Sequence, residues 1–148
     1  MNERVLRIGL IAFGTLNLAL GALMTLAPGE FYEKIGEYGV ENGHYIGDVG
    51  AFYVAAGVGL LLAVGRPSWR APLLVVSTIW YGLHAVNHLI DIDEAAKEGR
   101  GIADTVLLVL GTLALAWLAR EATRAEDGPP ARQAPAPKGR RPDYPPGD

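Results

Sequence analysis

Four long apolar segments dominate this chain of 148 residues. They cover about residues 5–27, 46–64, 71–90 and 102–119. At about 1.5 Å per residue, a helix of roughly 18 to 23 residues crosses a hydrocarbon layer of about 30 Å. A buried helix of a soluble bundle would carry a polar face, whereas residues 106–118, VLLVLGTLALAWL, include no charged side chain. The sequence therefore predicts an all-α fold, a four-transmembrane-helix bundle with up-and-down topology and short loops.

The C-terminal segment, residues 121–148, has a very different composition. It holds seven of the ten prolines and no large aliphatic side chain. Such a segment cannot bury enough apolar surface to offset the entropy lost on ordering. We therefore expect a membrane domain over residues 1–120, followed by a disordered tail over residues 121–148.

Basic residues are distributed unevenly between the two sides that this topology defines. Ten of the thirteen fall on the side of the two termini and the second loop. They are Arg4, Arg7, Arg66, Arg70, Arg120, Arg124, Arg132, Lys138, Arg140 and Arg141, against Lys34, Lys97 and Arg100 on the other side. Because cytoplasmic loops carry the excess of lysine and arginine, we expect a multi-pass protein of the inner, cytoplasmic membrane. Both termini should lie in the cytoplasm, with the loops around 28–45 and 91–101 outside.

Composition narrows the classes of function. The sequence contains no cysteine, which excludes disulfides and thiolate metal sites within this chain. No basic stripe with interleaved aromatic residues is present, so nucleic acid is not an expected partner. The start MNERVLR also resembles the leader of a signal peptide, but the apolar run that follows exceeds the usual 7–15 residues. Cleavage of the first segment stays open as an alternative.

Smaller patterns predict how the helices begin and pack. Residues 28–36, PGEFYEKIG, place three apolar side chains at helical spacing, as a short interfacial helix would. Small residues let transmembrane helices approach closely, and two rows of them stand out in the first two long segments. The rows are Gly14 and Gly21 in the first segment, and Gly47, Ala51, Ala55 and Gly59 in the second.

The third apolar segment ends in a polar stretch, WYGLHAVNHLID, at residues 80–91. At about 100° per residue, its polar side chains share one helical face. Ionisable side chains at membrane depth normally face a bundle interior or a wet cavity. The topology brings further polar residues to the same level from the second and fourth segments, and Asn17 of the first segment lies deeper, where it could close the cluster from below. We therefore predict one cluster at the outer leaflet, composed of His84, His88, Asp48, Asp104, Asp91, Asn87, Tyr81, His44 and Asn17.

Three kinds of chemistry fit such a cluster. Two histidines four residues apart can share a divalent metal, with a carboxylate completing the shell, which gives His84, His88 and Asp48 as metal ligands. Imidazole beside carboxylate can instead relay protons or face a quinone. The third interpretation is a hydrogen-bonded network that locks the helices together. The HxxxH spacing alone does not decide between them, and no GxSxG, phosphate-binding loop or HExxH motif is present.

The order of these features resembles the DoxX-like group of small bacterial four-helix membrane proteins. The likeness covers about residues 5–120 and lies in the topology and in two stretches, GDVGAFYVAAGVGLLLA and GLHAVNHLID. Some members act in quinone-linked sulfur oxidation or in membrane redox complexes, so the resemblance implies quinone chemistry. No catalytic residue of that group can be matched to this chain position by position.

Three functions follow as hypotheses. The first is a non-enzymatic accessory or structural subunit, in contact with the lipid bilayer and with other membrane subunits or further copies of itself. The second is a redox or proton-handling protein that uses the polar cluster. The third is a small four-helix drug exporter, which is disfavoured because such proteins depend on a carboxylate deep in the first helix, where this sequence offers only Asn17.

Overall fold

The computed structural model describes residues 3–95, 97 and 99–126. Over these residues the chain is helical, with a single isolated bridge between Tyr38 and Ala95 as its only β pairing. The helices are α1 Glu3–Leu26, α2 Pro28–Lys34, α3 Gly43–Ala63, α4 Pro67–Ile90 and α5 Arg100–Glu126. Of these, α1, α3, α4 and α5 are long and apolar enough to cross a membrane. The predicted all-α, four-helix transmembrane fold is confirmed, and the protein is a small integral membrane protein.

The ends of the helices differ from the predicted ones for local reasons. Helix α3 begins earlier than expected because Asn42 caps it, its side-chain oxygen accepting from the backbone N–H of Tyr45 at 3.1 Å. Helix α4 starts at Pro67, since proline is well suited to a first helical turn. Helix α5 continues to Glu126, where Ala122 is still buried against the bundle. Residues 121–126, expected to belong to the tail, are therefore helical, and the rest of the predicted tail, 127–148, lies outside the described residues.

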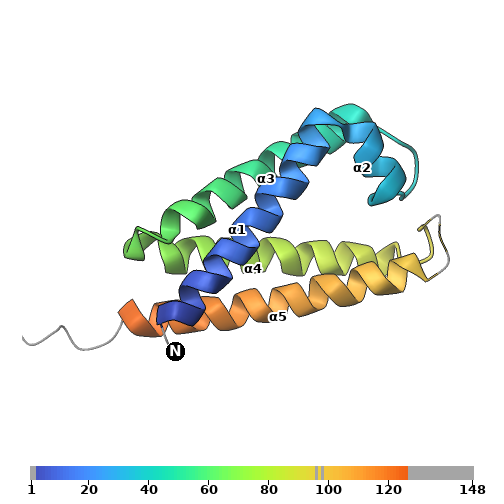
Figure 1. The fold of residues 1–148 in the computed structure, drawn as a ribbon. Helices are drawn as coiled ribbons and strands as arrows, with labels where there is room; N and C mark the ends of the chain where they lie inside the picture. Colours follow the sequence, from blue (N-terminus) through green and yellow to red (C-terminus); the bar gives the residue numbers. More distant parts are fainter. Residues whose placement is uncertain (1–2, 96, 98, 127–148) are drawn as a thin grey trace, which may run out of the picture.

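The four long helices form two antiparallel pairs, α1 with α3 and α4 with α5 (Figure 1). The pairs meet at the end of the bundle that holds the start of α1 and the end of α5, here called the N-terminal end. They diverge toward the other end, here called the α2 end, which holds α2, residues 36–42 and the α4–α5 connection. The buried apolar core lies mainly where the pairs meet, and it includes Leu6, Leu10, Leu60, Ala63, Leu74, Leu115 and Leu118.

Glycine lets α1 and α3 pack backbone against backbone. A Cβ atom added at Gly57 would lie 2.6 Å from the backbone nitrogen of Leu18, and one at Gly21 would lie 2.7 Å from the carbonyl oxygen of Gly50. Such approach is available only to glycine, because backbone atoms cannot move aside locally. The predicted row in α1, Gly14 and Gly21, is buried as expected.

The row predicted in α3 does not pack against α1, and only Gly59 at its end lies at a helix contact, where an added Cβ would lie 3.3 Å from Leu73 of α4. Ala51 and Ala55 are exposed, and a Cβ added at Gly47 would touch nothing within 4 Å. The buried glycines are instead Gly50 and Gly57. Their seven-residue spacing matches that of the two α1 glycines, so the two pairs interlock along the crossing.

Arg70 secures the N-terminal end. Its side chain is 10% exposed, and it donates to the carbonyl oxygens of Ala63 and Val64, at 3.1 and 3.0 Å. A third bond reaches the carboxylate of Glu3 at 2.9 Å. The guanidinium therefore satisfies the free carbonyls at the end of α3 and ties them to the first turn of α1.

Candidate functional site

A cavity of about 550 Å³ lies between the two helix pairs at the α2 end. Its walls are mostly apolar, and the apolar side chains come from α1, α2 and the residue after it, α3 and α5: Leu16, Leu20, Met24, Phe31, Ile35, Ile46, Val49, Leu107 and Leu108. Polar side chains line it as well, namely His84, Asn87 and His88 from α4, Asp91 directly after it, Asp104 from α5, Asn42, and Tyr32, Tyr38, Tyr45 and Tyr53. Five of the predicted cluster residues thus meet at one cavity.

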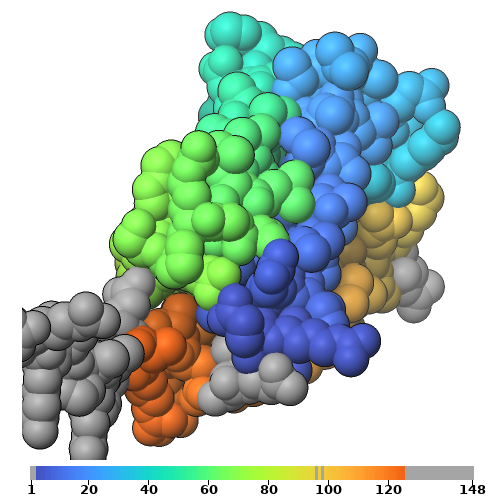
Figure 2. Space-filling model, turned by 60° about the vertical axis from the view of Figure 1, so that its left-hand side comes forward, coloured from blue at the N-terminus to red at the C-terminus, as the bar shows by residue number. Residues whose placement is uncertain are grey.

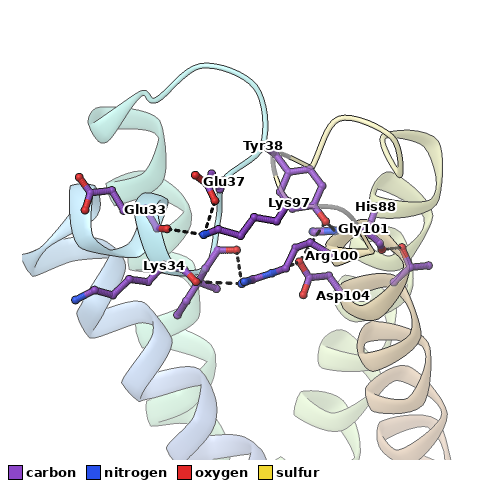
Figure 3. A network of polar contacts seen from close by, with 11 residues as sticks. Glu33, Lys34, Glu37, Tyr38, His88, Lys97, Arg100, Gly101 and Asp104 are labelled. Atoms are coloured by element: carbon purple, nitrogen blue, oxygen red, sulfur yellow. Dashed lines mark hydrogen bonds and ion pairs between the residues drawn. The ribbon is translucent and has the colours of Figure 1, made fainter.

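His88, Tyr38 and Asp104 form a hydrogen-bonded chain beside this cavity (Figure 3). The Tyr38 hydroxyl donates to Asp104 Oδ2 at 3.2 Å, and Nδ1 of His88 lies 3.1 Å from the same hydroxyl. Because the hydroxyl proton is directed at Asp104, Nδ1 must carry a proton and donate to the tyrosine oxygen. A neutral His88 then has Nε2 left as an acceptor. Burial, and next the nearby Asp104 carboxylate, raise the pKa of Tyr38 to about 12, so this hydroxyl stays protonated.

Arg100 and Lys97 hold the two helix pairs together at the α2 end. Arg100 bonds Asp104 Oδ2 through Nε at 3.1 Å and the backbone carbonyl of Ile35 through Nη2 at 2.9 Å. Lys97 pairs with Glu37 at 2.8 Å. Figure 3 shows both basic side chains reaching from the α4–α5 side toward α2. We call Glu37, Tyr38, Lys97, Arg100 and Asp104 the polar strap.

Figure 2 shows the same closure from outside, where the cyan surface of α2 and the following loop meets the gold surface of the α4–α5 connection. Within the strap the Asp104 carboxylate is balanced by the Arg100 guanidinium. The isolated bridge between Tyr38 and Ala95 adds a backbone contact across the same junction. The strap therefore closes the cavity toward the α2 end.

His84 differs from its neighbour His88. Its ring stacks on Trp80, with centroids 6.0 Å apart and an interplanar angle of 12°, and it meets the edge of His88 at 4.8 Å. Neither ring nitrogen of His84 makes a hydrogen bond to any of the described residues. Its imidazole lines the cavity, so both of its ring nitrogens are available to bond an occupant.

Two predicted members of the cluster lie elsewhere. His44 and Asp48 pair with each other at 3.6 Å, with side chains that are 91% and 68% exposed, and neither lines the cavity. The structure does not bring Asp48 to the predicted metal ligands His84 and His88. Among the described residues no group of three or more histidine, cysteine or acidic side chains is arranged to hold a metal ion. The reason is rotational, since α3 turns Gly50 and Tyr53 inward and so directs Asp48 outward.

The remaining predicted residues lie at the rim and below the cavity. Asn87 donates to Asp91 at 3.2 Å in an exposed contact at the rim. Asn17 and Tyr81 are buried, and the Asn17 amide donates to the Tyr81 hydroxyl at 3.1 Å and to the carbonyl of Phe13 at 2.8 Å. The two join α1 to α4 across the bundle, as the prediction of a locking network requires.

Sequence reasoning missed Tyr38, Arg100 and Trp80. The ion pair between Arg100 and Asp104 could have been predicted from the sequence, since the spacing of four residues places both on one helical face. Tyr38 lies in a loop and approaches His88 only through the fold. No family model matches this chain, and no curated protein or solved structure compared with it matches either.

Proposed function

We propose that this small membrane protein binds a lipophilic molecule with a neutral, oxygen-bearing head in the cavity at the α2 end. The observation that carries the proposal is His84, an imidazole with no hydrogen bond to the described residues, facing a cavity with mainly apolar walls. Small-molecule sites combine such walls with a few polar groups that orient the ligand, typically in volumes of about 300 to 1,000 Å³. The cavity has both properties.

The neutral head follows from the charges around the cavity. None of the described residues that line it is lysine or arginine, so an anionic head would enter a low-dielectric site without a counter-charge. Asp104 is already balanced by Arg100, and Asp91 lies at the rim in its bond with Asn87. An alcohol or phenol could donate to the free Nε2 of His88, and a hydroxyl or carbonyl oxygen could accept from the ring N–H of His84, without any charge being buried.

A quinone is one molecule of this class, and a second observation favours it. The hydrogen-bonded chain of His88, Tyr38 and Asp104 runs from the cavity to the strap. Such a chain could exchange protons with the head of a bound quinone. From the likeness in topology and in the stretches GDVGAFYVAAGVGLLLA and GLHAVNHLID, we also propose that the protein belongs with the DoxX-like group, whose members include quinone-linked ones. Its role would then be that of an accessory subunit that holds the molecule for a partner in the same membrane.

We further propose that the protein lies in the cytoplasmic membrane with both termini inside. The distribution of ten of thirteen basic residues supports this orientation. The α2 end, with the cavity and the strap, then faces outward.

The proposed ligand can be sought by extraction of the protein purified in mild detergent from its own membrane, followed by mass spectrometry of the extract. Two matched variants, His84→Phe and His44→Phe, replace an imidazole that lines the cavity and one that is solvated. Wild type and His44→Phe should carry the same lipophile. His84→Phe should lose most of it, because a lost hydrogen bond of about 1.4 kcal/mol weakens binding about tenfold. An empty wild type, or full retention by His84→Phe, would contradict the proposal.

A further inference from the structure

Different contacts close the cavity toward the α2 end and on the side between α3 and α4. Toward the α2 end, the polar strap joins the two helix pairs. Between α3 and α4, Trp80 packs against Phe52 with ring centroids 4.3 Å apart and against Tyr53 at 6.0 Å. Above these aromatic contacts the rim on that side is polar, formed by exposed Tyr45 and Asn87. Neither side offers an apolar passage into the bilayer.

The side between α1 and α5 is different. These helices touch near the N-terminal end, where a Cβ atom at Gly9 would meet the side chain of Leu118 at 2.6 Å. Closer to the α2 end, Leu16 of α1 and Leu107 of α5 both line the cavity. They are also 47% and 66% exposed. Both leucines therefore border the cavity and the surroundings of the bundle at once, as the edges of an opening do.

The position of this opening along α5 places it at the level of the lipid acyl chains. Leu107 is seven residues beyond Arg100, the first residue of α5, which is about 10 Å along the helix. The hydrocarbon half-layer of one leaflet is about 15 Å thick. The rim at this level is formed by leucine side chains, which are compatible with acyl chains and not with water or head groups.

We propose that the occupant reaches the cavity sideways from the leaflet at the α2 end, through the opening between Leu16 and Leu107. This inference rests on the proposed function and adds the source of the ligand: a molecule dissolved in the bilayer, with an alkyl chain and a neutral hydrogen-bonding head. The head moves inward to His84 while the chain stays between α1 and α5. A second copy of the protein fits less well, because a helix laid over the two leucines would leave the imidazole of His84 without a hydrogen-bond partner.

The test uses hexadecanol with a diazirine next to its hydroxyl group, added to vesicles that contain the full-length protein and illuminated at successive times. Labelled residues are identified by mass spectrometry. Two variants are compared, Leu107→Trp at the opening and Leu113→Trp on the same helix, where the leucine is 61% exposed and does not line the cavity. The probe should label Tyr53 and His84 in wild type and in Leu113→Trp. In Leu107→Trp the rate of this labelling should fall several-fold, while labelling of lipid-facing residues stays unchanged.

A parallel experiment in detergent separates this inference from the proposed function. Without a bilayer the probe reaches the cavity from any side, so absence of label at Tyr53 and His84 in detergent would refute the binding site itself. Cavity labelling in vesicles that is equally fast in Leu107→Trp and wild type would refute only the sideways route. Labelling in detergent that is lost in vesicles, together with crosslinked dimers, would show that a second copy covers the opening, which also overturns the route.

Discussion

Gly57→Ala should destabilise the protein strongly, because the added methyl group meets backbone and not a movable side chain. The new Cβ would lie 2.6 Å from the nitrogen of Leu18 and 2.8 Å from the carbonyl oxygen of Gly14. Overpacking in a well-packed interface costs about 1–3 kcal/mol, and here relief requires α1 and α3 to separate. The unfolding midpoint in mild detergent, followed by circular dichroism, should fall clearly below that of wild type.

Gly47→Ala is the matched control in the same helix. A Cβ atom there touches nothing within 4 Å, and alanine is favoured over glycine in helices by about 0.5–1 kcal/mol. The unfolding midpoint should stay the same or rise. Because both variants gain the same helix propensity, the difference between them isolates the contact with α1. Equal midpoints for the two variants would mean that α1 and α3 do not pack through Gly57.

The orientation predicts an all-or-none result with cysteine labelling. The chain has no cysteine, so single substitutions report without background. Glu41→Cys and Ser68→Cys are chosen because both side chains are exposed, one beside the α2 end and one in the first turn of α4 at the N-terminal end. On intact cells a membrane-impermeant maleimide should label the protein with Glu41→Cys and leave the one with Ser68→Cys unlabelled. The Ser68→Cys protein should react only after permeabilisation, and the reverse pattern would contradict the proposed orientation.

The sequence correctly predicted the features that depend on a single helix. The apolar segments predicted four spans, and helical periodicity placed His84 and His88 on one inward face. The prediction failed where the rotation of a helix about its own axis depends on how it packs against another helix. Asp48, Ala51 and Ala55 looked suitable for an interface, but the match between the α3 and α1 glycines directs these three residues outward.

The contacts of loop residues could not be predicted from the sequence for a related reason. Tyr38 has no periodic pattern that would link it to His88, fifty positions later in the chain, and only the folded loop places its hydroxyl 3.1 Å from the imidazole. The cavity itself also depends on the divergence of the two helix pairs (Figure 1). No spacing within a single segment encodes that divergence.

The most direct test of ligand binding is the ¹⁵N NMR spectrum of the histidine rings in the purified protein. The whole sequence has three histidines, so single substitutions assign every ring. The spectrum is recorded first on protein as purified from its membrane and then after exhaustive delipidation. We predict that the ring nitrogens of His84 shift when its hydrogen-bonded occupant is removed, while those of solvent-exposed His44 do not. Identical His84 resonances before and after delipidation would contradict the conclusion that this imidazole holds a ligand.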